Sequence, residues 1–206
     1  SILFESGQHD VAEACLSRLD ASLSTNPSAL THNHEENPSR RGGLSVSEIQ
    51  GRIAAQRTYW ATLKGDLDGI TVYSQKALDR LNIKDDAWRM MVYLGSAISN
   101  EARGDIDASM KTHYEAVKAA KSTGSVYYYM ITRVWLAIVL KTMGKLPEAM
   151  EICRQLLQEV DEKKLTFNIA KGHAFGAWGE IVYERNELEE SYEYAKKGVE
   201  LLEEGH

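Results

Sequence analysis

Four stretches of the sequence share one pattern: GDLDGITVYSQKAL begins at Gly65, GDIDASMKTHYEAV at Gly104, GKLPEAMEICRQLL at Gly144 and NELEESYEYAKKGV at Asn186. Their first residues are 39, 40 and 42 positions apart. Self-similarity at this spacing is typical of helical repeat proteins. Each unit of such an array is a helix pair that buries its apolar face against its neighbours, so the expected function is binding rather than chemistry.

The first residue of each stretch predicts a turn between two helices. Glycine adopts the left-handed backbone conformation freely, and asparagine tolerates it better than most residues. We therefore predict that the first helix of each pair ends at a cap formed by Gly65, Gly104, Gly144 or Asn186. The second helix then follows at once. Asp68 and Asp107 are the expected N-caps, and Pro147 is expected in the first turn of its helix.

The pattern predicts an all-α, tetratricopeptide-like right-handed superhelix of about five helix-turn-helix repeats. A weaker copy, GQHDVAEACLSRLD from Gly7, places a partial N-terminal helix pair at residues 1–24. Residues 25–47 contain two prolines and paired glycines without helical periodicity, so we expect a linker or poorly ordered loop there. The repeat array itself is expected over residues 48–206.

The composition fits a helical array and limits the partners of this segment. The chain has 206 residues, of which 43% are hydrophobic and 26% charged, so a substantial core is possible without a disulfide or a metal. The net charge of −6 argues against direct contact with nucleic acid, and no apolar run is long enough to suggest a membrane span. Cys15 and Cys153 are expected to be small core residues, which favours a cytoplasmic location.

Motifs for catalysis or metal binding are missing from the sequence. We find no G-x-S-x-G, H-E-x-x-H or C-x-x-C pattern, so we do not expect an enzyme and assign no catalytic residue. His32 and His34 lie in the polar segment before the array and could be drawn as a metal site. Two histidines without a third ligand are more often solvated, so we predict no metal.

Residues 126–143 form the most apolar predicted helix, as expected for an inner helix with neighbours on both sides. Arg133 is the exception to the apolar character of this helix. Its guanidinium comes one turn after Tyr129, where it can stack on the ring, and it should either pair with an acid, which we favour, or face a cavity. The four tryptophans fall in first helices and are expected in the core: Trp60, Trp88, Trp135 and Trp178.

Two longer segments carry a resemblance to a known family: VWLAIVLKTMGKLPEAMEICRQLL and IQGRIAAQRTYWATLKGDLDGITVYSQKAL. From about Ser47 onward the chain resembles the tetratricopeptide-like superhelix of the large ATP-binding LuxR-type transcription regulators, the maltose-activator group. In that family the superhelix lies between an N-terminal ATPase and a C-terminal helix-turn-helix domain. The resemblance implies a segment that senses a small-molecule inducer or binds a protein or peptide partner.

The phosphate loop G-x-x-x-x-G-K-[ST] does not occur in the sequence, so the resemblance implies the middle domain alone. We expect no cofactor in this chain and ATP in a neighbouring domain. Self-association is left open. The alternative is a general peptide-binding scaffold, but the inward positions of the first helices lack the Lys and Asn of a carboxylate clamp; they hold Ala55, Tyr59, Leu94, Ile98, Val134 and Ile138.

A concave groove in such a superhelix is lined by residues of the first helices. Counting from the turns, the residues expected to bind a ligand there are Arg52, Tyr59, Tyr129, Arg133, His173 and Glu180.

Overall fold

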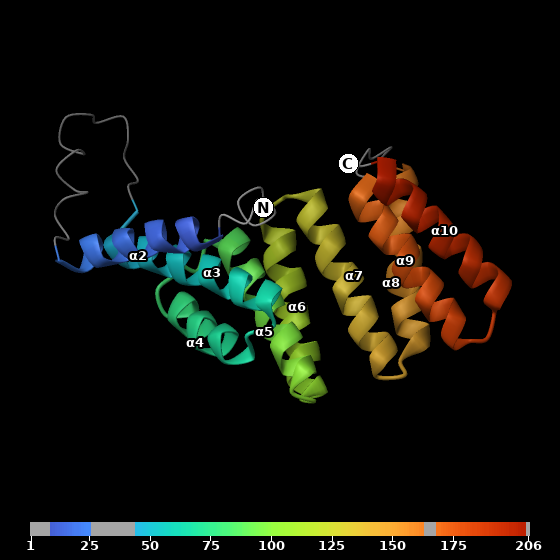
Figure 1. Cartoon of the computed structure of the whole chain (residues 1–206). Coiled ribbons are helices and arrows are strands. Elements are labelled where there is room, and N and C mark those ends of the chain that lie inside the picture. Colours follow the sequence, from blue (N-terminus) through green and yellow to red (C-terminus); the bar gives the residue numbers. More distant parts are fainter. Residues whose placement is uncertain (1–8, 26–43, 163–167, 205–206) are drawn as a thin grey trace.

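The computed structural model describes residues 9–25, 44–162 and 168–204, and this part of the chain contains nine α-helices and no strand. The helices stack one after another along the molecule (Figure 1). They are α2 (His9–Thr25), α3 (Val46–Lys64), α4 (Leu67–Leu78), α5 (Asp86–Ala102), α6 (Ile106–Ser122), α7 (Val126–Thr142), α8 (Leu146–Glu162), α9 (Asn168–Glu184) and α10 (Leu188–Glu204).

Eight of these helices form the four pairs α3–α4, α5–α6, α7–α8 and α9–α10, and α2 precedes them. The predicted all-α superhelix of helix pairs is therefore confirmed. Residues 1–8 and 26–43 lie outside the described residues, and with them lie the start of the expected N-terminal pair, most of the expected linker, and His32 and His34.

The four predicted turns have the expected left-handed backbone. The φ angles are 68° at Gly65, 80° at Gly104, 72° at Gly144 and 62° at Asn186. Gly65 directly follows the last residue of a first helix, and each of the other three lies two positions after the last residue of its first helix. A fifth left-handed glycine, Gly124 with φ 71°, ends α6 between two pairs and was not predicted. The repeat turn is thus built from a C-terminal cap that glycine forms without strain.

The predicted N-caps Asp68 and Asp107 were wrong by two residues, whereas Pro147 lies in the first turn of α8, as predicted. Asp66 caps α4, because its Oδ1 accepts a hydrogen bond from the Gly69 amide at 2.9 Å. Asp105 caps α6 in the same way, at 3.1 Å from the Ala108 amide. The left-handed residue turns the chain so sharply that the next residue already stands at the cap position, and Asp68 is left on the surface of α4.

A different cap begins α3. The hydroxyl of Ser45 accepts from the Glu48 amide at 3.1 Å, and the Glu48 carboxylate accepts from the Ser45 amide at 2.8 Å. This reciprocal pair is a capping box, and it fixes the first residue of the array at Val46. These hydrogen bonds hold the pKa of the Glu48 carboxyl below its usual value.

The largest core cluster lies where α7, α8 and α9 meet. It contains Met130, Val134, Leu140, Leu156 and Ile181, each no more than 2% exposed. Cys153 is fully buried in this cluster, as predicted. Burial of α7 on several faces agrees with its apolar sequence, since neighbouring pairs pack on both of its sides.

Two predictions about the core were wrong. Cys15 is exposed, because it lies on a face of α2 that no described helix covers. Trp135 is 36% exposed, because its side chain lies at the gap between two first helices instead of between the helices of one pair. Trp60 is buried as predicted, at 8% exposed, and Trp88 and Trp178 are half-buried.

Helix α2 is held on the array by a cluster of polar contacts. The Arg57 guanidinium on α3 lies 2.8 Å from Glu13 Oε1 and 3.1 Å from Asp20 Oδ2. Ala12 and Leu23 supply the buried apolar residues of α2. Within the described ranges, no helix combines the length and the apolar character needed to cross a lipid bilayer.

Candidate functional site

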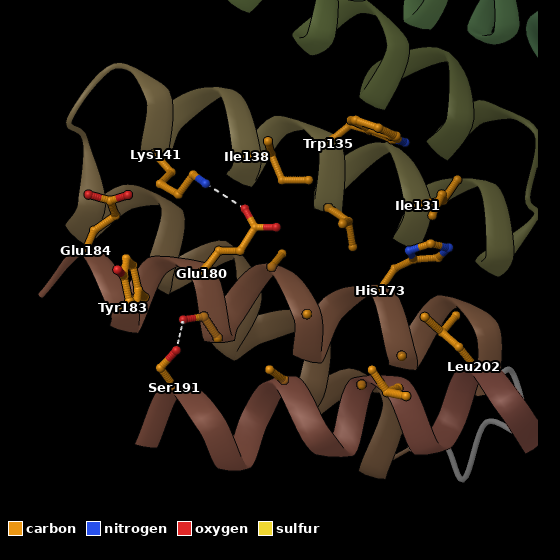
Figure 2. Close-up of a pocket in the computed structure, with 18 residues that line it drawn as sticks. Ile131, Trp135, Ile138, Lys141, His173, Glu180, Tyr183, Glu184, Ser191 and Leu202 are labelled. Carbon is orange, nitrogen blue, oxygen red and sulfur yellow. Dashed lines mark hydrogen bonds and ion pairs between the residues drawn. The ribbon is translucent and has the colours of Figure 1, made fainter. Parts of the chain in front are cut away.

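A groove of about 530 Å³ lies between the first helices α7 and α9, with α10 along its lower edge (Figure 2). We call it the α7/α9 groove. Helix α7 contributes one wall and α9 the other. The side chains that define it are Ile131, Trp135, Ile138 and Lys141 from α7, and His173, Glu180, Tyr183 and Glu184 from α9.

Glycines in α9 shape the floor of the groove. At Gly172 an added Cβ would lie 2.9 Å from the carbonyl oxygen of Gly198, so this glycine lets α10 pack directly on the α9 backbone. Gly179 allows the same close packing further along α9. There Ser191 Oγ donates a hydrogen bond to the Gly179 carbonyl at 2.9 Å. At Gly176 an added Cβ would meet no atom within 4 Å. The missing side chain there leaves space open to the groove.

The middle of the groove is apolar. Ile131, Trp135 and Ile138 follow one another along the α7 side in Figure 2. They lie three or four positions apart, which places them on one helix face. An indole that is about one-third exposed offers a flat surface on which a ligand can stack.

One end of the groove carries an ion pair. Lys141 Nζ lies 2.6 Å from Glu180 Oε2, and the two side chains approach each other across the gap (Figure 2). The lysine side chain is 19% exposed and the glutamate 57%. Glu184 adds a second carboxylate close to this end. The charges at this end therefore sum to a small negative value.

His173 lies toward the opposite end of the groove, across from Ile131 (Figure 2). Partial desolvation of the ring lowers the pKa of this histidine, so the neutral imidazole dominates at pH 7. A neutral imidazole can donate one hydrogen bond and accept another. The groove thus has polar groups at both ends and an apolar middle.

Of the six residues predicted to bind a ligand, the structure brings only His173 and Glu180 into this groove. The other predicted residues lie elsewhere. Arg52 on α3 pairs with Asp85 at 2.8 Å and has its guanidinium 5.9 Å from the Trp88 ring centroid, at a shallow pocket near the start of α5. Tyr59 is half-buried on α3 and does not line the α7/α9 groove.

Tyr129 and Arg133 belong to a second cavity, of about 550 Å³, between α6, α7 and α8. Arg133 Nη1 lies 2.8 Å from Glu159 Oε1, and its Nη2 donates to Gln155 Oε1 at 3.2 Å. The guanidinium carbon is 5.0 Å from the Tyr129 ring centroid. The ion pair that was predicted for Arg133 is therefore present, together with the predicted stacking on Tyr129. The second cavity lies next to this ion pair.

Several residues that line the groove were not predicted from the sequence. Trp135 was assigned to the core, and Lys141 and Tyr183 were not considered. A usable signal was present in the repeat register: Ile138 and Glu180 both lie six positions before their turn residues, so neighbouring units place them side by side. Of the positions taken as inward, Val134 and Ile138 line the groove, although Val134 is only 2% exposed, whereas Ala55 is fully buried.

The described residues contain no group of three or more His, Cys, Asp or Glu side chains that could hold a metal ion. The polar groups of the groove are the Lys141–Glu180 ion pair, one further carboxylate, one imidazole, the hydroxyl groups of Tyr183 and Ser191, and the indole N–H of Trp135. This set can bind a ligand by stacking, hydrogen bonding and burial of apolar surface.

Comparison with known proteins agrees with this architecture. The sequence model of the MalT-like TPR region matches residues 51–206, which is most of the chain. The chain belongs to this family. The match covers all four helix pairs except the first residues of α3, so the α7/α9 groove lies inside the MalT-like TPR region.

Among solved structures, the crystal structure of BtubC (BKLC) from P. vanneervenii is similar to this chain, with a TM-score of 0.61. The two sequences are 15% identical, and the similarity covers 93% of this chain and 75% of that one. At this identity the likeness shows the fold alone. No curated protein matches the sequence.

Proposed function

We propose that this chain is the effector-sensing segment of a LuxR-type, MalT-like transcription regulator, and that the α7/α9 groove is its ligand site. The single observation that supports the proposal most is the open groove inside the family region, with an exposed indole beside a charged pair. A ligand-binding site is typically an apolar concave surface with a few placed polar groups. The ATPase and DNA-binding functions would belong to other domains of the regulator, and this segment would act without catalysis.

The chemistry of the groove restricts the ligand. Lys141 and Glu180 already neutralise each other at 2.6 Å, and Glu184 leaves a small negative excess. A neutral or cationic ligand suits this balance better than an anion, because an anion would compete with two carboxylates for one ammonium group. We therefore propose a neutral polar inducer, or a short segment of a partner, that stacks on Trp135 and hydrogen-bonds at the ends.

The test uses the transcriptional response of the full-length regulator to its inducer. Trp135→Ala should reduce the response strongly while the melting temperature changes little, because the indole is already partly exposed. Tyr128→Ala is the matched control: it removes an aromatic ring of similar exposure, 38% against 36%, from the same helix but outside the groove. An equal response from both variants would remove the groove from the sensing mechanism.

A further inference from the structure

The contacts between neighbouring helix pairs differ at one place in the array. Helix α3 packs on α5, and α7 packs on α9, so the first helices of adjacent pairs touch in both halves of the array. Among the described residues, α5 and α7 make no comparable contact, and the second and third pairs are joined mainly through α6 and α7. We call α2–α6 the N-terminal block and α7–α10 the C-terminal block. The two blocks follow one another along the molecule (Figure 1).

The apolar core is divided at the same place. Met90 of α5 forms a cluster with Ala119 and Ala120 of α6, whereas the largest cluster belongs to α7, α8 and α9. Helix α6 contacts both clusters, since Met110 packs against the largest one. In the part of the chain that the structure describes, no cluster of buried residues includes both α5 and α7. The two blocks therefore do not share a continuous core.

The repeat register gives a reason for the separation of α5 and α7. Nine positions before the turn residue, α5 has Gly95, α9 has Ala177 and α7 has Trp135. At Gly95 an added Cβ would lie 2.7 Å from Thr62 Oγ1 of α3, so the missing side chain lets α5 approach α3 closely. Ala177 is 4% exposed and belongs to the cluster of α7, α8 and α9. An indole is too large for such an approach, so Trp135 keeps α7 away from α5.

A second position on the same face of α7 agrees with this explanation. Sixteen positions before the turn residue, α5 has Trp88, α9 has Ala170 and α7 has Tyr128. Trp88 is half-buried, with the Arg52 guanidinium of α3 5.9 Å from its ring centroid, and Ala170 is fully buried. Tyr128, in contrast, is 38% exposed. The face of α7 that would meet the preceding first helix thus carries aromatic surface that α5 could cover, and covering it would be favourable.

The contact that joins the two blocks contains a buried polar group. The ninth position after the turn faces the first helix of the next pair: on α4 it is Ser74, whose hydroxyl accepts from Ser96 Oγ of α5 at 2.9 Å. On α6 the ninth position is His113, which is fully buried. Neither of its ring nitrogens has a hydrogen-bond partner among the described residues. An unpaired buried polar group is costly, so the contact of α6 with α7 is weaker than a fully paired one.

We propose that the array bends at the α6–α7 contact between an open and a closed state, and that Trp135 controls the change. In the open state, which this structure shows, the indole separates α5 from α7. In the closed state the indole turns toward the α7/α9 groove, and α5 packs on α7 as it packs on α3. Closing covers Tyr128. The bending needs no ligand, so the proposal goes beyond the sensing role of the groove.

Distances between two spin labels in the full chain test the bending. Leu63→Cys on α3 with Tyr183→Cys on α9 reports across the two blocks, and Leu63→Cys with Lys111→Cys on α6 reports within one block. All three positions are exposed. Cys15 is replaced by serine because it is exposed, whereas Cys153 is buried and stays. We expect one narrow distance within the block and a distribution at least about twofold wider between the blocks.

A variant tests the role of the indole. Trp135→Ala gives α7 the residue type that α9 has at this position, so the distance between the blocks should become narrow and shorten by at least about 2 Å, because directly packed helices lie about 8–10 Å apart. Trp135→Leu is a second, milder variant and should shift the distance in the same direction. Tyr114→Ala is the control: it removes a ring that is 47% exposed on α6, at the second cavity, and should change neither distance.

A distance between the blocks that is as narrow as the one within the block would overturn the bending, and this measurement needs no change at Trp135. An unchanged distance in the two Trp135 variants, or an equal shift in Tyr114→Ala, would overturn the role of the indole. All distances are measured without a ligand. A failure here is therefore separate from a failure of the groove as a sensor, which the transcriptional response reports.

Discussion

Arg133 and Glu159 form an ion pair whose two partners differ in burial. The distance from Arg133 Nη1 to Glu159 Oε1 is 2.8 Å, but the arginine side chain is 7% exposed and the glutamate 33%. The guanidinium is further held by Gln155 and by the ring of Tyr129. The buried member of the pair is thus the cation, and this determines which partner is more costly to remove.

We predict that Glu159→Met destabilises the protein more than Arg133→Met. Removing the carboxylate leaves a nearly buried cation short of its counterion, at a cost of about 2–3 kcal/mol in the free energy of unfolding. Removing the arginine leaves a carboxylate that water can reach, at about 1 kcal/mol. Urea denaturation of both variants and of the double mutant measures the coupling. The reverse order would contradict this account of the pair.

The left-handed cap at Gly104 gives a second prediction. Gly104→Val should lower the stability by about 1 kcal/mol or more, because a β-branched residue resists positive φ. An added Cβ there meets no atom within 4 Å, so the cost would come from the backbone alone. Gly104→Asn is the matched control and should cost less, since Asn186 adopts the same conformation in the last pair. Equal melting temperatures for the two variants would refute the cap.

The contact between α9 and α10 gives a third prediction. Gly172→Ala should destabilise by about 1–3 kcal/mol, because the new methyl group would lie 2.9 Å from a backbone oxygen of α10. Gly176→Ala, one turn later, meets nothing and should be neutral or stabilising by up to about 1 kcal/mol. Thermal unfolding of the two variants separates the effect of packing on stability from the effect of helix propensity. Similar effects would show that the close approach is not needed.

His113 predicts a dependence of stability on pH. This side chain is fully buried on α6, and neither ring nitrogen has a hydrogen-bond partner among the described residues. Burial lowers the pKa of His113 to about 4, from 6.5. The unfolded state therefore binds a proton at higher pH than the folded state does. Stability should fall as the pH drops from about 6.5 to about 4, by at most about 3 kcal/mol from this group.

The variant His113→Leu should remove this part of the pH dependence, because the ninth position of the repeat accepts apolar residues such as Cys153. The measurement is the urea midpoint at several pH values between 4 and 7. His173→Gln serves as the control and should change the profile less, since His173 is exposed. An unchanged profile in His113→Leu would assign the acid sensitivity to other groups.

The isolated chain is expected to bind neither ATP nor DNA. It has no phosphate loop, and its net charge of −6 opposes contact with a polyanion. Calorimetric titration with ATP and a gel-shift assay at low salt are the measurements. Saturable micromolar binding of ATP would contradict the assignment of nucleotide binding to a neighbouring domain.

The sequence alone determined the helix pairs and their turns. A left-handed cap depends on one residue and its neighbours, so Gly65, Gly104, Gly144 and Asn186 could be placed without knowledge of the tertiary structure. The choice between successive acids as N-caps was harder. Asp66 and Asp68 are both chemically suitable, and only the direction in which the chain leaves the turn selects Asp66.

Only the tertiary structure decided which side chains meet between pairs. Lys141 and Glu180 are 39 residues apart, and their contact depends on how α9 is rotated and shifted against α7. The same arrangement exposes Trp135 and sends Arg133 to Glu159 on the other side of α7. Helical periodicity gives the face of one helix on which a residue lies, but the packing of every interface together sets the angle between pairs. That angle opens the groove, and no local stretch of sequence encodes it.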